Sequence, residues 1–311
     1  MQPLVQTIQR DSAITFPMLG NLTINPPSYF TVFGMDIYFY GVIIGLGFIL
    51  GILYCSHNSR RFGIDQDSVY DVMIWLIPTA IIGARLYYVF CHWSNYVGDT
   101  VWQTLWNWCK IWEGGTAIPG GLLLATFCVW LYARKKKIPF GAIMDCVVLG
   151  LLIGQIIGRW SNFMNREYIG EVTDIFCRMG LTTGGTTYYV HPLFLYESLW
   201  NLVGFIFLAI WTRKGKRQYD GQATLLYFVW YGLIRFLLEP LRTSPLLIPG
   251  TALRASQVIG GGMCLVALVI LVVQSRRAHR PEDLYVNRVR AQSAAAEEKE
   301  KTPNGSEDKT V

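Results

Sequence analysis

Long apolar stretches alternate with polar ones along most of the chain. The apolar stretches lie near 37–55, 72–91, 117–133, 142–160, 193–211, 223–241 and 255–274, and each has 17 to 20 residues. An α-helix needs about 20 predominantly apolar residues to cross the hydrocarbon core of a bilayer, which is about 30 Å thick. The pattern therefore predicts an all-α membrane protein with about seven transmembrane helices.

Basic residues occur in alternate connections between these segments. They cluster at 60–61, 134–137, 213–217 and 276–280, whereas the connection before the third apolar segment holds only Lys110. Cytoplasmic loops of membrane proteins carry an excess of Lys and Arg. We therefore expect the N-terminus outside and the C-terminus in the cytoplasm.

The composition agrees with a membrane protein and narrows the chemistry. Hydrophobic residues make up 52% of the chain and charged residues 15%, whereas soluble domains have about 25% charged residues. The net charge of +6 follows from the basic cytoplasmic loops and their attraction to lipid surfaces, so no nucleic-acid partner is predicted. The seven cysteines form no CxxC pair, so neither a metal site nor a disulfide framework is predicted.

The segments outside the apolar runs predict the domain boundaries. Residues 1–35 contain the turn-rich run NPPSYFTVFG, and we expect them to approach the first helix along the outer leaflet. Residues 36–280 form the seven-helix domain, and its longest outer loop, about 161–192, contains the glycines, threonines and aromatic residues typical of a small outer subdomain. Residues 281–311 are polar and poor in large apolar side chains, which predicts a disordered cytoplasmic tail.

Several charged residues lie within or at the ends of the apolar segments. A charge at membrane depth costs about 2.5–3.5 kcal/mol on insertion scales, so such residues usually face a cavity or one another. In the predicted orientation one group lies in the outer half of the bilayer: Arg85, Arg159, Glu197, Arg235, Glu239 and Arg242. Asp145 lies near the start of its helix, where a carboxylate is favoured, and a structural role is expected for it.

The spacing of the outer group predicts two polar helix faces. Tyr231, Arg235, Glu239 and Arg242 recur at i, i+4, i+8 and i+11, and Arg159, Asn162 and Arg166 recur at i, i+3 and i+7 if the helix continues through GRWSNFMN. Two opposed faces that carry arginines would form an anion pocket, because guanidinium groups match phosphate and carboxylate geometry. At this depth the expected anion is a phospholipid headgroup.

Structural interpretations stay open for single residues in this group. Arg235 and Glu239 could form a plain intrahelical ion pair, Glu197 could pair with Arg85, and His191 could cap a loop or carry a proton. An anion transporter would need polar residues that continue to the inner side, and this chain mostly lacks them. The joint placement of one set at one depth favours a functional site: Arg159, Asn162, Glu167, Arg235 and Glu239.

Six runs of the sequence carry a resemblance to a known family. They are FYGVIIG (39–45), GARLYY (83–88), IWEGGTAIPGGL (111–122), GQIIGRWSNFMNREYIG (154–170), HPLFLYES (191–198) and WYGLIRFLLEPLR (230–242). In this order they resemble the phosphatidylglycerol–prolipoprotein diacylglyceryl transferase family, and the similarity runs from about residue 20 to 275. The family signature of arginine, asparagine, glutamate and glycine is matched by Arg159, Asn162, Glu167 and Gly170.

The resemblance implies an enzyme of the bacterial plasma (inner) membrane with its active site toward the outer face. Members move a diacylglyceryl group from phosphatidylglycerol to the lipobox cysteine thiol of a preprolipoprotein, so the implied partners are phosphatidylglycerol, lipobox signal peptides and membrane lipids, without a cofactor or a metal. The implied catalytic residues are Arg159, Asn162, Glu167, Arg235, Glu239, Tyr40 and Tyr231. The implied phosphatidylglycerol-binding residues are Arg159, Asn162, Gly170, Arg235, Arg85, Gly120 and Gly121, with His191, Tyr196, Glu197 and Arg242 as further candidates.

The resemblance also leads to a hypothesis for the roles of these residues. Arg159 and Arg235 would hold the lipid phosphate, Asn162 would position it, and Glu167 or Glu239 would orient the arginines. The group that takes the proton of the thiol stays open between His191, Tyr40, Glu239 and a phosphate-bound water.

Two positions depart from the family pattern. Many members carry HGG where this chain has Pro119-Gly120-Gly121, so that histidine is not available as a base. Ser161 stands where glycine usually precedes the asparagine. The first departure leaves an alternative function open, a catalytically weak or inactive paralogue that binds phospholipid or lipoprotein signal peptides.

Overall fold

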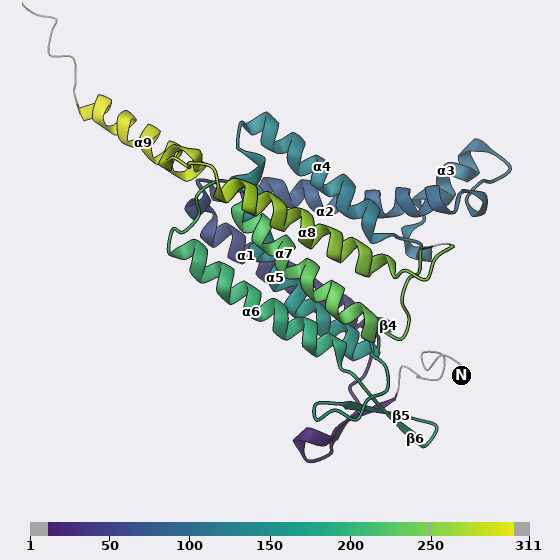
Figure 1. Ribbon diagram of the computed structural model, residues 1–311. Helices are drawn as coiled ribbons and strands as arrows, with labels where there is room; N and C mark the ends of the chain where they lie inside the picture. The colour runs from purple at the N-terminus through teal and green to yellow at the C-terminus, as the bar shows by residue number, and fades with distance from the viewer. Residues whose placement is uncertain (1–11, 249, 302–311) are drawn as a thin grey trace, which may run out of the picture. The chain divides into compact units, whose positions relative to one another are not determined.

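The computed structural model describes residues 12–248 and 250–301, and most of them are helical (Figure 1). The helices are α1 (Phe39–Asn58), α2 (Gln66–Cys91), α3 (Val101–Cys109), α4 (Ile118–Lys136), α5 (Phe140–Asn165), α6 (Leu193–Arg213), α7 (Gln222–Leu238), α8 (Ala255–Ser275) and α9 (Tyr285–Lys301). The strands are β1 (Ala13–Phe16), β2 (Leu22–Ile24), β3 (Tyr29–Val32), β4 (Met35–Tyr38), β5 (Met179–Thr183) and β6 (Thr186–Val190). The prediction of a mostly helical membrane protein is confirmed.

Among the described residues, six helices are long and apolar enough to span a membrane, where the sequence predicted about seven. They are α1, α2, α5, α6, α7 and α8. The remaining predicted segment, 117–133, corresponds to α4, which has 19 residues. This helix ends on Arg134, Lys135 and Lys136, and these charges lower its mean hydropathy. Length and composition therefore support six spans directly, and a seventh needs another argument.

The contacts divide the chain into two compact units, of which the first contains residues up to Cys55 and residues 145–280. In this unit α7 lies beside both α6 and α8 (Figure 1). Helices α1 and α5 cross at glycines, because a Cβ atom on Gly51 would lie 2.7 Å from the backbone oxygen of Gly150. One turn further, the buried Cys55 thiol donates to the backbone oxygen of Cys146 at 3.3 Å. Such small-residue contacts let membrane helices approach closely.

The first unit also contains a four-stranded antiparallel sheet in the order β2-β1-β5-β6. Strands β1 and β2 belong to the predicted N-terminal segment, 1–35, and β5 and β6 belong to the predicted loop subdomain, 161–192. Ile14 pairs with Leu181 across β1 and β5, and both side chains are fully buried. The two segments therefore fold together, although the sequence predicted them separately. Residues 1–11 lie outside the described residues.

Apolar packing connects this sheet to the helices of the same unit. Phe163 on α5 and Phe194 on α6 belong to one buried cluster with Ile14 and Leu181, and the rings of the two phenylalanines lie 5.0 Å apart. Strands β3 and β4 pair as a separate hairpin, which leads directly into α1. The packing fixes the short segment after α5, where the GRWSNFMNREYIG motif continues.

The second unit contains residues 56–144 and the described residues from Pro281 onward. Helix α2 begins after Asp65, whose carboxylate accepts a hydrogen bond from the backbone N–H of Ser68 at 2.9 Å, as an N-cap residue does. Helix α2 packs against α4. Pro119 lies in the first turn of α4, where a helix does not need the N–H that proline lacks.

The structure differs from the predicted disorder of 281–311 over part of that range. Helix α9 covers 17 of these residues, and Val286 near its start is 6% exposed. Val286 packs on the turn before α2, since a Cβ atom on Gly63 would lie 2.8 Å from its Cα atom. The run AAAEEKEK consists of strong helix formers, which explains a helix in a segment too polar for a core. Residues 302–311 lie outside the described residues.

Candidate functional site

Three helices of the first unit bring charged side chains together. Arg159 lies on α5, Glu197 on α6 and Arg235 on α7. Glu197 is fully buried, and its Oε1 atom accepts a hydrogen bond from Nη2 of Arg159. Its Oε2 atom lies 3.5 Å from Nη1 of Arg235. Glu197 thus pairs with these two arginines, and the predicted alternative partner, Arg85, binds other groups described below.

A second carboxylate continues the cluster toward the end of α7. Glu239, which begins the 3-10 turn Glu239–Leu241, is 1% exposed. Its Oε2 atom lies 3.4 Å from Nη2 of Arg235, and its Oε1 atom lies 3.7 Å from Nη1 of Arg242. The predicted stripe of Arg235, Glu239 and Arg242 is therefore present as a connected chain of charges.

Tyr168 lies at the centre of this cluster, and sequence reasoning did not select it. Its hydroxyl donates to Oε2 of Glu197 at 2.8 Å and accepts from Nη1 of Arg235 at 2.8 Å. The guanidinium carbon of Arg159 lies 4.5 Å from the centre of its ring, and that of Arg242 lies 5.3 Å from it. Tyr168 is part of the quoted motif, but an uncharged aromatic residue in an aromatic-rich chain gives no signal of its own.

Arg254 is a second residue that sequence reasoning missed. It directly precedes α8, and its guanidinium donates to the backbone oxygen of Glu239. A second bond, 3.4 Å long, joins it to the backbone oxygen of Arg242. Arg254 thus satisfies carbonyl groups of the turn that carries the charged pair. It lies outside the predicted polar stripes, so spacing could not identify it.

The cluster contains three guanidinium groups, those of Arg159, Arg235 and Arg242, but two carboxylates. The side chains of the three arginines are 21%, 14% and 28% exposed, whereas both carboxylates are buried. The Nε atom of Arg242 is buried and has no hydrogen-bond partner among the described residues. Positive charge is therefore in excess and partly accessible, which is the electrostatic condition for binding an anion such as a phosphate.

Asn162 and Glu167 belong to the same motif but occupy different positions. The Oδ1 atom of Asn162 accepts from Nη1 of Arg159 at 3.3 Å, so Asn162 contacts the cluster as expected. Glu167 is exposed, and its carboxylate accepts from Nδ2 of Asn165 at 3.2 Å. The hypothesis that Glu167 orients the arginines is not supported by these contacts. Glu239, the alternative in that hypothesis, does contact Arg235.

The expected helical stripe of Arg159, Asn162 and Arg166 breaks at its last member. Helix α5 ends at Asn165, and Arg166 has a left-handed backbone with φ +54°. Its buried guanidinium donates to the backbone oxygens of Ser12 at 3.1 Å and Pro26 at 2.8 Å. Arg166 therefore fastens the end of α5 to the N-terminal strands and does not face the anion cluster.

Gly170 connects the cluster to the sheet, and only glycine fits there. Its N–H donates to the backbone oxygen of His191 at 3.0 Å, and it forms a β-bridge with Arg242. A Cβ atom on Gly170 would lie 2.5 Å from the Cβ atom of His191. The glycine of the family signature thus permits the backbone contact that places Tyr168 two residues earlier.

His191 and Tyr196 form a smaller polar group beside this bridge. The hydroxyl of Tyr196 lies 3.4 Å from Nδ1 of His191 and 3.4 Å from Sγ of Cys177. Partial burial lowers the pKa of His191, and the charge of Glu171 opposes that effect. His191 is consequently a neutral imidazole at neutral pH.

The two other tyrosines predicted from the resemblance lie in different surroundings. Tyr231 packs against the apolar cluster of Leu193, Ile234 and Leu238, and its ring stacks on that of Tyr227 at 5.7 Å. Tyr40, near the start of α1, is 38% exposed. Within the described ranges neither hydroxyl hydrogen-bonds to the arginines.

Arg85, Gly120 and Gly121 lie in the second unit. The guanidinium of Arg85 donates to backbone oxygens of the segment that follows α2: Asn107 at 2.8 Å, Trp108 at 2.9 Å, and Gly114 and Gly115 at 2.5 and 2.9 Å. Arg85 is 3% exposed. Most of its N–H donors therefore bond to backbone oxygens of its own unit, and these donors are not available to a lipid phosphate.

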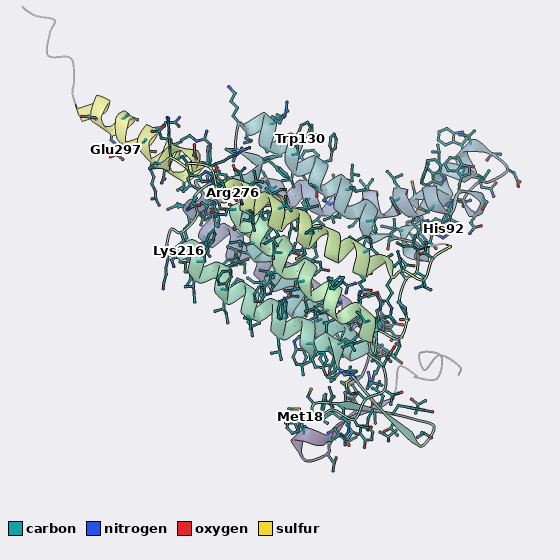
Figure 2. All side chains as sticks on the ribbon, in the orientation of Figure 1. Met18, His92, Trp130, Lys216, Arg276 and Glu297 are labelled. Carbon is teal, nitrogen blue, oxygen red and sulfur yellow. The ribbon has the colours of Figure 1, made fainter. Side chains whose placement is uncertain are left out.

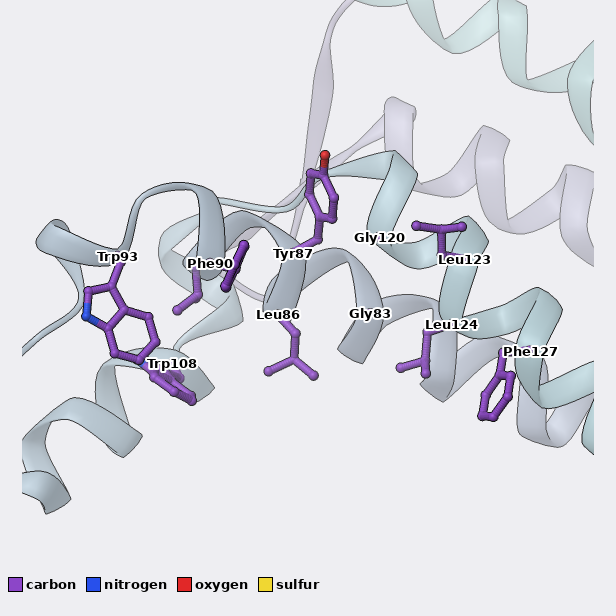
Figure 3. Close-up of a pocket in the computed structure, with 11 residues that line it drawn as sticks. Gly83, Leu86, Tyr87, Phe90, Trp93, Trp108, Gly120, Leu123, Leu124 and Phe127 are labelled. Carbon is purple, nitrogen blue, oxygen red and sulfur yellow. The ribbon is translucent and has the colours of Figure 1, made fainter. Parts of the chain in front are cut away.

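The two glycines bring α2 and α4 into close contact. A Cβ atom on Gly121 would lie 2.7 Å from the backbone oxygen of Ala80, and one on Gly120 would collide with Tyr87. Gly120 also lines a pocket of about 520 Å³ (Figure 3), whose other walls include Leu86, Phe90, Trp93, Trp108, Leu123 and Phe127. The pocket is apolar, so it offers no group that would bind a phosphate.

Within residues 12–248 and 250–301, no three His, Cys, Asp or Glu side chains gather in a way that could hold a metal ion.

Comparisons with known proteins agree with the character of this site. The profile of the prolipoprotein diacylglyceryl transferase family matches residues 27–273. The phosphatidylglycerol–prolipoprotein diacylglyceryl transferase of Halalkalibacterium halodurans is 39% identical over 253 residues, which cover 78% of this chain and 83% of that protein. Proteins of the same name from Finegoldia magna (36% identical; 80% and 95% covered) and Pediococcus pentosaceus (35%; 86% and 99%) are similar over almost their full lengths. The chain therefore belongs to the prolipoprotein diacylglyceryl transferase family, as its motifs predicted.

Proposed function

We propose that this chain transfers the diacylglyceryl group from phosphatidylglycerol to the lipobox cysteine thiol of a preprolipoprotein. Relatives that carry this activity in their names match it over most of their length. Within the structure, the observation that carries the proposal is the excess of guanidinium over carboxylate groups around Tyr168. The names of the relatives favour this reading over the binding-only paralogue, for which Pro119 was the best support.

The reaction explains why positive charge would be needed. The thiol loses its proton, and the sulfur attacks the glyceryl carbon next to the phosphate. A carbon–sulfur bond forms while the carbon–oxygen bond breaks, and the electron pair of the broken bond stays on the phosphate oxygen. The released glycerol phosphate thus carries one more negative charge than the phosphodiester did. Guanidinium groups aimed at that oxygen stabilise the transition state more strongly than they stabilise the bound lipid before reaction.

The contacts suggest a role for each charged residue of the cluster. Arg159 and Arg235 would hold the phosphate oxygens, and the free Nε–H of Arg242 would provide a further donor. Glu197 and Glu239 would orient the arginines, and Asn162 would position Arg159 through their 3.3 Å bond. The proton acceptor is proposed to be His191, because it is neutral and lies beside Gly170 at the edge of the cluster.

We propose that α4 is the seventh transmembrane span. The basic clusters at 60–61 and 134–137 follow α1 and α4, so both helices would end on the cytoplasmic side. Helix α2 then leads outward and α5 also begins inside, which requires one inward crossing between them. Helix α4 is the long helix available for that crossing. The N-terminus would lie outside and the C-terminus inside.

This orientation would place the arginine cluster toward the outer face of a bacterial plasma membrane. In the first unit, Lys216 and Arg276 follow the C-terminal ends of α6 and α8, and Met18 of the strand region lies at the other end of these helices (Figure 2). The sheet of β2-β1-β5-β6 would then be the outer subdomain. A lipobox signal peptide and membrane phosphatidylglycerol would both reach the cluster from that side.

Transfer by the purified chain tests the proposal. The enzyme is placed in vesicles that contain phosphatidylglycerol, and a lipobox peptide is followed by its mass increase and by release of glycerol phosphate. We expect both products with the wild type and strongly reduced products with Arg159→Ala and Asn162→Ala. Vesicles of phosphatidylcholine alone serve as the lipid control. A folded wild-type chain that binds the lipid but modifies no peptide would support the binding-only paralogue instead.

A further inference from the structure

The surroundings of Tyr168 are unusual for a tyrosine side chain. The guanidinium carbons of Arg159, Arg242 and Arg235 lie 4.5, 5.3 and 5.8 Å from the centre of its ring. Cations at such distances are attracted by the electron-rich face of an aromatic ring. The ring therefore sits among three like charges that would otherwise repel one another, and it keeps them at separate positions.

The hydroxyl of Tyr168 bonds to both partners of a long ion pair. It lies 2.8 Å from both Oε2 of Glu197 and Nη1 of Arg235, whereas those two atoms lie 3.5 Å from each other. Without the hydroxyl, Arg235 can close onto the carboxylate as a direct ion pair, a geometry that arginine and carboxylate groups favour. A guanidinium engaged in that way has fewer donors for a phosphate.

The hydroxyl keeps its proton at neutral pH and acts as a neutral bridge. Burial, with the charge of Glu197, raises the pKa of Tyr168, while Arg235 and Arg159 oppose the rise. A protonated hydroxyl donates to Glu197 and still accepts from Arg235. This arrangement adds no negative charge, so the excess of positive charge in the cluster is preserved.

The backbone holds Tyr168 in this place against its own preference. Its φ angle is +57°, a left-handed conformation that bulky residues rarely adopt. Hydrogen bonds on both sides fix it: Glu167 N–H donates to the backbone oxygen of Asn162 at 2.9 Å, and Gly170 N–H donates to that of His191 at 3.0 Å. Strained backbone that its surroundings maintain is typical of functional sites.

We propose that Tyr168 is a positioning residue for the lipid phosphate. Its ring spaces Arg159, Arg235 and Arg242, and its hydroxyl keeps Arg235 from closing onto Glu197. The cluster thereby stays open to an anion instead of collapsing into ion pairs. This inference rests on the proposed transferase function, and it adds a residue that the family signature of Arg159, Asn162, Glu167 and Gly170 does not include.

The test compares three variants in the vesicle assay, with KM measured separately for phosphatidylglycerol and for the lipobox peptide. Tyr168→Phe keeps the ring and removes the hydroxyl, and we expect its KM for the lipid to rise about fivefold to tenfold, as for the net loss of one ordinary hydrogen bond. Tyr168→Leu removes the ring as well, and we expect a rise of more than about 30-fold. The KM for the peptide should stay within about twofold of the wild type in both.

Tyr227→Phe is the matched control. Its buried hydroxyl accepts a 2.8 Å hydrogen bond from Nε2 of Gln155 in the same unit, and the variant removes that bond. Among the described residues, no guanidinium contacts this hydroxyl. We expect an unchanged KM for the lipid. A merely structural role of Tyr168 would lower the amount of active enzyme in both Tyr168 variants and leave both KM values unchanged, which would overturn the inference.

Direct binding separates this inference from the proposed function. Phosphatidylglycerol in detergent micelles is titrated into the wild type, Tyr168→Phe and Tyr168→Leu, and the dissociation constants are compared. If the wild type transfers nothing but the affinity falls in the order wild type, Phe, Leu, the proposed function fails and the positioning role stands. Equal affinities in all three proteins would refute the positioning role, whether or not transfer occurs.

Discussion

The two ends of α5 each carry a buried ion pair, but the pairs differ in how completely they are satisfied. Near the start of the helix, the fully buried carboxylate of Asp145 accepts from Nη1 of Arg217 at 3.0 Å. It also accepts from the N–H of Gly221 at 2.9 Å and from the N–H and hydroxyl of Thr224, both at 2.8 Å. Asp145 thus caps the N-terminus of α7, whose own N-cap residue, Gly221, has no side chain to do so.

At the other end of α5, Arg159 belongs to a cluster with more guanidinium groups than carboxylates. Its side chain is 21% exposed, whereas that of Arg217 is 5% exposed. The Nε atom of Arg242 has no partner in the described part of the chain. The exposure and balance of the charges therefore distinguish a structural ion pair from a proposed binding cluster on the same helix. A buried carboxylate with several hydrogen bonds, such as Asp145, specifies packing, whereas a partly open cluster with an excess of one sign is suited to a ligand.

The largest expected effect concerns the partly exposed cluster around Arg159, which we call the open end of α5. Arg235→Lys keeps the positive charge but replaces the planar fork of guanidinium with a single ammonium point charge, which cannot hold both Tyr168 and a phosphate. We expect transfer to fall by about 10²–10³-fold, the range for loss of one donor at a developing negative charge. The rate of peptide modification at saturating phosphatidylglycerol measures it.

Arg217→Lys is the matched control at the buried pair of Asp145 and Arg217, which we call the closed end of α5. It makes the same chemical change in a pair with no assigned contact to the lipid, so transfer per folded molecule should stay close to that of the wild type. An equal loss of transfer in both lysine variants would remove the distinction between the two ends of α5.

The second prediction concerns stability at the closed end. Asp145→Asn removes the closer of the two carboxylates that face Arg217, since Asp220 lies 3.8 Å from the same nitrogen, and breaking a buried ion pair costs up to about 3–5 kcal/mol. We expect the midpoint of unfolding in detergent to fall markedly, with unchanged KM for phosphatidylglycerol in the fraction that remains folded. Wild-type stability of this variant would show that the capping of α7 by Asp145 is dispensable.

The third prediction concerns the backbone that supports the open end. Gly170→Ala places a Cβ atom 2.5 Å from that of His191, and relieving such overpacking typically costs about 1–3 kcal/mol. Because Tyr168 lies two residues away, its shift should also raise the KM for phosphatidylglycerol. Gly262→Ala is the control, since nothing lies within 4 Å of its added Cβ atom. Identical behaviour of the two alanine variants would contradict the tight contact at Gly170.

The sequence predicted the helical spans and most of the charged cluster because both depend on local patterns. Apolar length marked the helices, and the spacing of Arg235 and Glu239 follows the helical repeat, whereas Arg242 comes after the 3-10 turn that ends α7. Helix α4, the proposed seventh span, does not qualify on length and composition because its basic end lowers its hydropathy. The pairing of β1 with β5 joins segments more than 160 residues apart along the chain, and no local pattern encodes such a partner.

Other parts of the site depend on where the helix ends. The spacing placed Arg166 on the face of Arg159, but α5 stops at Asn165 and the chain turns left-handed. That turn sends Arg166 to the strands, leaves Glu167 exposed and brings Tyr168 among the arginines. For Arg85, a sequence pattern contains no information about the backbone carbonyl groups that accept most of its hydrogen bonds. Its role as a phosphate ligand stays a prediction.

The smallest expected effect is the dependence of stability on pH that His191, beside the open end, contributes. Burial places the pKa of His191 below the ordinary value of about 6.5, so the unfolded chain takes up this proton more readily than the folded one. The contribution of His191 to stability is therefore complete above about pH 6.5 and declines as the pH falls through the lowered pKa. His191→Gln removes this titration. Between pH 7.5 and 5 the unfolding midpoint of the wild type should fall more than that of the variant, and parallel pH profiles would mean that the imidazole is not held neutral by its surroundings.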